Sequence, residues 1–220
     1  MKAALFLQKT IGQKVVLGLT GLGLCFFILI HMLGNLFILS GSREYNLYAQ
    51  RLHEIKIIEL LELGLLFFFV SHILLSVFVQ IKNYLAKGRT YYKKASGHKK
   101  TSLANRLLIL QGGVILVFLV IHLLTFKFGT YYEVVIDGKP MRDIYRLVVE
   151  SFQSPIFLGG YSVSLLVLAI HVIHGLPASI KSLGFNHPNY TPWVEKFSWV
   201  FGVGVMIGFL VPLGYIHWFL

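Results

Sequence analysis

Residues 11–35 read IGQKVVLGLTGLGLCFFILIHMLGN, and this stretch decides the fold. A run that contains no charged residue, 15–39, begins within it, directly after Lys14. A helix rises about 1.5 Å per residue, so about 20 apolar residues cross the hydrocarbon core of a bilayer, which is about 30 Å thick. The stretch therefore predicts a transmembrane helix, and His31 lies well inside it.

Four further charge-free runs have similar length: 63–81, 107–126, 155–180 and 197–220. The whole chain has a mean hydropathy of +0.72 and only 13% charged residues, which is far from the composition of a soluble domain. We therefore expect an all-α membrane protein with a single domain over residues 1–220. Its five spans should cover about 15–39, 60–83, 105–127, 155–181 and 197–218.

The charges divide between the two ends of the predicted spans. The N-terminal tail and the segments 82–106 and 181–196 together carry 13 basic residues and 1 acidic residue, whereas 43–62 and 127–150 carry 7 basic and 8 acidic residues. Cytoplasmic loops are enriched in Lys and Arg. We expect a multi-pass membrane protein with its N-terminus in the cytoplasm and its C-terminus outside. The pI of about 9.8 then follows from topology and gives no reason to expect nucleic-acid binding.

Four of the five runs contain a histidine in their apolar interior, and these are His31, His72, His122 and His171. An ionisable residue in hydrocarbon is costly, and it therefore indicates function. Imidazoles from facing helices are the axial ligands that a b-type haem iron uses. The only cysteine is Cys25, and no Cys-x-x-Cys-His motif occurs, so any haem is expected to be bound without a covalent link.

The depth of each histidine within its span divides the four into two pairs. Counted from the basic edge of each span, His31 and His122 lie 17 and 16 residues away, whereas His72 and His171 each lie 10 residues away. At 1.5 Å per residue the two levels are about 25 Å and about 15 Å from that edge. We therefore expect an outer pair, His31 with His122, and an inner pair, His72 with His171. His174, one turn from His171, is the other candidate on this span, but the depth of His171 matches that of His72 better.

Two outer segments, 45–58 and 141–152, show apolar residues at roughly helical spacing and predict short surface helices. Glycines at 18, 21 and 23 of the first span and at 112 and 113 of the third predict close approach of another helix or of a flat macrocycle.

The segment 11–35 resembles the first span of the diheme cytochrome b558 subunits of succinate:quinone oxidoreductases. The stretch HVIHGLPASIKSLGFNHPNY, residues 171–190, resembles the H-x-x-H-G…LG-x-N-x-P stretch of the same family. The resemblance extends over five spans, four histidines in matching order and a basic cytoplasmic loop.

This resemblance implies a membrane anchor of a succinate dehydrogenase or fumarate reductase in the bacterial inner membrane. It implies two b haems, docking of a flavoprotein subunit and an iron–sulfur subunit on the cytoplasmic face, and electron exchange with menaquinone. It also implies the histidine pairing stated above. Three side chains are candidates for the periphery of the inner haem: His174, Lys181 and Arg106. His174 can instead bond a backbone carbonyl, and the two cations can simply extend to the membrane surface.

Quinone chemistry needs protons, so a titratable group should line the site. Glu59 and Glu62, at the outer start of the second span, are the candidates, although both are equally explained as ordinary surface charges. Two alternatives remain open for the whole chain. One is the diheme anchor of another quinone-linked enzyme, such as a hydrogenase or formate dehydrogenase, and the other is a haem-free transporter with buried histidines.

Overall fold

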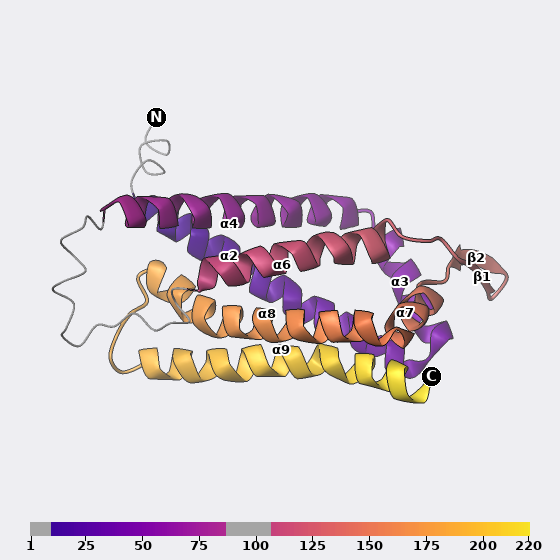
Figure 1. Ribbon diagram of the computed structural model, residues 1–220. Coiled ribbons are helices and arrows are strands. Elements are labelled where there is room, and N and C mark those ends of the chain that lie inside the picture. Colours follow the sequence, from indigo (N-terminus) through magenta and orange to yellow (C-terminus); the bar gives the residue numbers. More distant parts are fainter. Residues whose placement is uncertain (1–9, 87–106) are drawn as a thin grey trace.

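The computed structural model describes residues 10–86 and 107–220, and five long helices dominate it (Figure 1). They are α2 (Thr10–Asn35), α4 (Ile58–Ala86), α6 (Leu108–His122), α8 (Pro155–Ser182) and α9 (Thr191–Phe219). Two of them continue at their C-terminal ends as irregular turns, α2 as the 3-10 turn η1 (Leu36–Ser40) and α6 as the π-helical turn η3 (Leu123–Lys127). All five, taken with these turns, are long and apolar enough to cross a membrane, which confirms that part of the prediction.

Four of the long helices form a ring in which α4 packs on α2, α2 on α8, α8 on α6, and α6 more loosely on α4. The fifth helix, α9, packs along α8 and also contacts α2 (Figure 1). The helices α2 and α6 therefore face each other across the ring, and so do α4 and α8. The centre of this ring is where a bundle of this type holds cofactors or metals.

Glycines in α2 bring α8 close. A Cβ at Gly18 would lie 2.9 Å from the Ser179 carbonyl oxygen, and a Cβ at Gly21 would lie 2.9 Å from the Ser179 hydroxyl. Close approach through small residues is how membrane helices gain packing energy. A Cβ at Gly112 or Gly113 of α6 would meet nothing within 4 Å in the part of the chain that is described, so no helix packs closely there, and approach of a macrocycle stays a prediction.

Short elements gather at one end of the bundle, where the chain also ends (Figure 1). They are α3 (Ser42–Glu54), the strands β1 (Glu133–Ile136) and β2 (Lys139–Arg142), and α7 (Ile144–Gln153). The helix expected over 141–152 is wrong in its first residues, because β2 includes residues 141 and 142 and α7 begins at Ile144. The expected all-α class does not include the hairpin of β1 and β2. Asp137 and Gly138 both adopt positive φ, 53° and 74°, which is the geometry of a tight two-residue hairpin turn.

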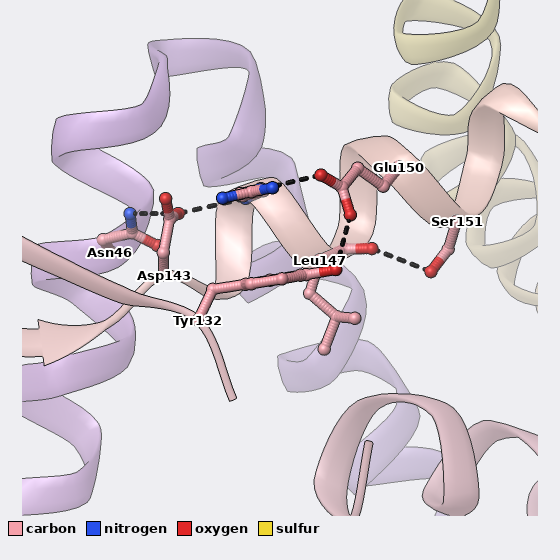
Figure 2. A network of polar contacts seen from close by, with 7 residues as sticks. Asn46, Tyr132, Asp143, Leu147, Glu150 and Ser151 are labelled. Atoms are coloured by element: carbon pink, nitrogen blue, oxygen red, sulfur yellow. Dashed lines mark hydrogen bonds and ion pairs between the residues drawn. The ribbon is translucent and has the colours of Figure 1, made fainter. Parts of the chain in front are cut away.

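A polar network joins α3 to α7 (Figure 2). The side chain of Asn46, 1% exposed, donates to Asp143 Oδ1 over 2.8 Å and accepts from the Tyr145 backbone N–H over 2.9 Å. Asp143 also accepts from the Arg146 backbone N–H and so caps α7. Further along α7, hydrogen bonds from Arg146 and Tyr132 lower the pKa of Glu150 below its ordinary value.

A cluster of buried apolar side chains lies at this same end of the bundle, among η1, α3, α7, α8 and α9. Its members are Ile38, Tyr45, Val148, Phe152, Tyr161, Leu165, Leu213 and Ile216. Burial of this cluster holds the short elements over the end of the ring. Packed side chains therefore fill this end of the bundle.

Candidate functional site

The outer histidine pair lies between α2 and α6. The rings of His31 and His122 have centroids 5.8 Å apart and are nearly perpendicular, with an interplanar angle of 88°. Phe27 stacks on His31 at 5.3 Å, and Phe209 of α9 lies 5.8 Å away. Both imidazoles are half-buried by the chain.

Polar partners from other positions reach both outer rings. The Tyr161 hydroxyl lies 3.3 Å from His122 Nδ1. Asn35 donates to the His31 carbonyl over 2.8 Å and lies 3.5 Å from His31 Nε2, which is at the outer limit of a hydrogen bond. The Tyr45 hydroxyl in turn donates to Asn35 Oδ1 over 3.2 Å. These contacts orient the outer pair from α8 and α3.

Aromatic side chains surround the Tyr161 ring. Four of them have centroids within 6.1 Å of it: Phe118, Phe126, Phe152 and Phe157. Two of these, Phe118 and Phe126, also lie within 5.9 Å of the His122 ring. This packing keeps the contact between Tyr161 and His122 away from water.

The inner histidine pair lies between α4 and α8. The rings of His72 and His171 have centroids 6.4 Å apart with an interplanar angle of 74°. Thr20 Oγ1 of α2 lies 3.3 Å from His72 Nδ1. The Nδ1 atom of His171 is buried and makes no hydrogen bond within residues 10–86 and 107–220. A buried polar atom of this kind calls for an explanation such as a missing ligand.

Each pair spans a diagonal of the helix ring, and the two pairs lie at different levels. Along α2, Thr20 touches the inner pair and His31 belongs to the outer pair, and these positions are 11 residues, or about 16 Å, apart. In each pair that equal depth predicts, the two imidazoles therefore lie beside each other. Haem ligation by these histidines stays a prediction.

The separation of the rings fits one axially ligated iron per pair. An imidazole nitrogen binds a transition metal at about 2 Å and the ring centroid lies about 1 Å further back, so two axial rings have centroids about 6 Å apart. The observed values are 5.8 Å and 6.4 Å. The described residues contain no cluster of three or more His, Cys, Asp or Glu side chains that would hold a metal by itself.

The three candidates for the haem periphery do not gather at the inner pair. His174 Nδ1 lies 2.8 Å from the Ile170 carbonyl of its own helix, and Lys181 forms an ion pair with Glu195 at 2.8 Å. Arg106 lies outside the described residues. Of the two quinone candidates, Glu62 forms an ion pair of 2.5 Å with Lys127 of η3, and Glu59 is exposed on the first turn of α4.

Thr20 and Tyr161, which contact the histidines, are residues that the sequence analysis missed. A weak signal existed for Tyr161, because it is the only tyrosine in the charge-free run 155–180. Thr20 carries no such signal, because a threonine within a transmembrane helix usually bonds its own backbone. Only the packing of α2 against α4 brings it to His72.

The fold and the site together define a multi-pass helical membrane protein with two intramembrane histidine pairs at two levels. Comparison of the chain with family models, curated proteins and solved structures gave no match in any of the three. The functional argument therefore depends on the residues and geometry of this chain.

Proposed function

We propose that this chain is the membrane anchor and diheme cytochrome b subunit of a succinate:quinone oxidoreductase. The observation that carries the proposal is the pair of diagonal histidine contacts at two levels, His31 with His122 and His72 with His171, at separations that fit one iron each. The choice of succinate:quinone oxidoreductase as the particular enzyme depends on the sequence resemblance to the cytochrome b558 subunits.

In this proposal His31 and His122 hold an outer haem b, and His72 and His171 hold an inner haem b. When bound, the two haems supply one-electron transfer between an iron–sulfur subunit and menaquinone. The chain itself fixes the imidazoles, because side chains from a third helix contact one ring of each pair: Tyr161 contacts His122, and Thr20 contacts His72. Apolar packing around the rings keeps the sites at low dielectric and excludes water.

Charge supports the proposed orientation and partners. In the described part of the chain, the bundle end opposite α3 and α7 carries four cations, Lys14, Lys82, Lys181 and Lys196, with a single acid, Glu195. We infer that this end lies in the cytoplasm of a bacterium, where a flavoprotein subunit and an iron–sulfur subunit dock on it. Succinate or fumarate then reacts in the flavoprotein, away from this chain.

Two non-covalent haems per chain are the first expected result. The purified chain should contain close to two iron atoms, show the reduced-minus-oxidised spectrum of a b-type cytochrome, and release all its haem into acid acetone, because no Cys-x-x-Cys-His motif is present. A preparation with one haem or none contradicts the proposal. Absence of haem favours a transporter with buried histidines.

Reduction by succinate separates the proposed enzyme from other diheme anchors. Membranes that contain the chain should show haem reduction with succinate, and a flavoprotein should purify with the chain. Haem that is reduced with hydrogen or formate, and not with succinate, assigns the chain to a different quinone-linked enzyme.

The quinone is proposed to bind at the outer level, near the ends of α2, α4 and α6. The ion pair between Glu62 and Lys127 supports this position, because Lys127 lies five residues beyond His122 and therefore close to the outer pair. Glu62 is half-exposed, with 51% of its side chain accessible, so it can exchange protons with water outside the membrane. Glu59, one turn away, is the second candidate.

Glu62→Gln should lower quinone-linked electron transfer by about tenfold or more, because a positioned proton-transfer group contributes about a hundredfold or more to rate. Glu59→Gln, which breaks no ion pair seen among the described residues, should have a smaller effect. Electron transfer from succinate to a soluble dye, which bypasses this chain, is the control and should not change. Normal quinone turnover in both variants excludes both carboxylates, and a quinone bound beside Lys82 and Lys181 excludes the outer site.

A further inference from the structure

We propose that Thr20 is a positioning residue that holds the His72 imidazole as its Nδ1–H tautomer, which leaves Nε2 with a free lone pair for a metal ion. The inference deepens the proposed function, since it names a group that prepares one ligand of the inner pair. It depends on the proposed function only for the identity of the metal group.

The hydrogen bonds around Thr20 fix the direction of its contact with His72. Thr20 is 3% exposed, and its Oγ1 donates to the Leu17 carbonyl oxygen over 3.0 Å. A hydroxyl has one proton, and a carbonyl can only accept it. The 3.3 Å contact between Thr20 Oγ1 and His72 Nδ1 therefore has a single polarity, with His72 Nδ1–H donating to the threonine oxygen.

Electrostatics require the same protonation. An unprotonated Nδ1 would place its lone pair against the oxygen atom of Thr20. In the interior of a membrane such a repulsion is screened little, because the dielectric constant is low.

Packing keeps the ring in this orientation. The position of a Cβ on Gly21 lies 3.3 Å from His72 Cε1 and 3.7 Å from His72 Nδ1, so this edge of the ring lies directly against α2. With Nδ1 held by Thr20, Nε2 is the ring nitrogen left for a metal ion. The nearest ring on α8 is that of His171, whose centroid lies 6.4 Å away. Metal-binding histidines are held in just this way by a hydrogen bond to their second nitrogen.

The test compares Thr20→Val, which keeps the shape and removes the hydroxyl, with Thr20→Ser, which restores the hydroxyl. The full chain, labelled with ¹⁵N-histidine and kept reduced, is studied by NMR, and the His72 signals are assigned by their loss in His72→Ala. Wild type and Thr20→Ser should carry the proton on His72 Nδ1 with slow exchange. In Thr20→Val this proton should exchange at least about tenfold faster, while that of His122 should not change.

The wild-type spectrum decides the proposal even if Thr20→Val fails to fold. A proton on Nε2 of His72 in the wild type overturns it, and so does an equal exchange rate in wild type and a folded Thr20→Val. Because this measurement reads the imidazole itself, it gives an answer whether or not haem is bound.

A redox titration gives the second measurement. Loss of an acceptor at Nδ1–H makes the imidazole less basic, so the midpoint potential of the inner haem should rise in Thr20→Val, return in Thr20→Ser, and leave the outer haem unchanged. Retention of the inner haem should fall by about 10- to 100-fold. A wild-type chain without haem refutes the proposed function alone, whereas unchanged inner potential and retention in Thr20→Val refute the role of Thr20 alone.

Discussion

His122→Ala is expected to remove the outer haem and to leave the inner haem in place. The two pairs are independent in the structure, since His31 and His122 contact each other and His72 and His171 contact each other on the other diagonal. A haem that keeps one axial histidine loses half of its protein ligands, and the partner imidazole stays unpaired. The iron content should therefore fall from about two to about one per chain.

Alanine substitution of each of the four histidines in turn tests the pairing directly. His31→Ala should give the same redox titration as His122→Ala, without the outer haem. His72→Ala should give the same titration as His171→Ala, without the inner haem. Haem content and redox titrations of the purified variants measure this. If all four variants lose both haems, or if His31→Ala resembles His72→Ala, the pairing is refuted.

His174→Ala is the matched control, because His174 lies one turn from His171 on the same helix and bonds the Ile170 carbonyl. It should retain both haems. Loss of the inner haem in His174→Ala together with its retention in His171→Ala would show that His174 is the ligand.

Gly21→Ala is the second substitution with a large expected effect. The added methyl group would lie 2.9 Å from the Ser179 hydroxyl and 3.3 Å from His72 Cε1, so the Ser179 side chain and the imidazole have to adjust. Overpacking of this kind costs about 1–3 kcal/mol. A shift of the ring also spoils the ligand geometry, so we expect retention of the inner haem to fall by about tenfold or more, with the outer haem preserved.

Gly204→Ala is the control for this substitution, because a Cβ on Gly204 of α9 meets nothing within 4 Å among the described residues. It should retain both haems in full. Adding Ser179→Ala to Gly21→Ala removes the closer of the two contacts and leaves the one with His72. Complete recovery in this double variant would mean that helix packing alone caused the loss, and normal haem content in Gly21→Ala would contradict the steric argument.

The five long helices and the depth of each histidine follow from the sequence by itself. Apolar runs of bilayer length are helices, because no other local structure satisfies the backbone hydrogen bonds in hydrocarbon. The rise per residue is constant, so counting from the charged edges gives the depth of a residue without knowledge of its neighbours. His31 and His122 could thus be assigned to one level, and His72 and His171 to another.

The lateral arrangement and the partners of the histidines needed the tertiary structure. Which helix lies beside which depends on packing between helix faces, such as Gly21 against Ser179 and His72, and no periodicity along one segment encodes it. Thr20 reaches His72 across 52 residues of sequence, and Tyr161 reaches His122 across 39. Depth is a property of one helix and can be counted, whereas contacts between helices depend on the positions of all of them.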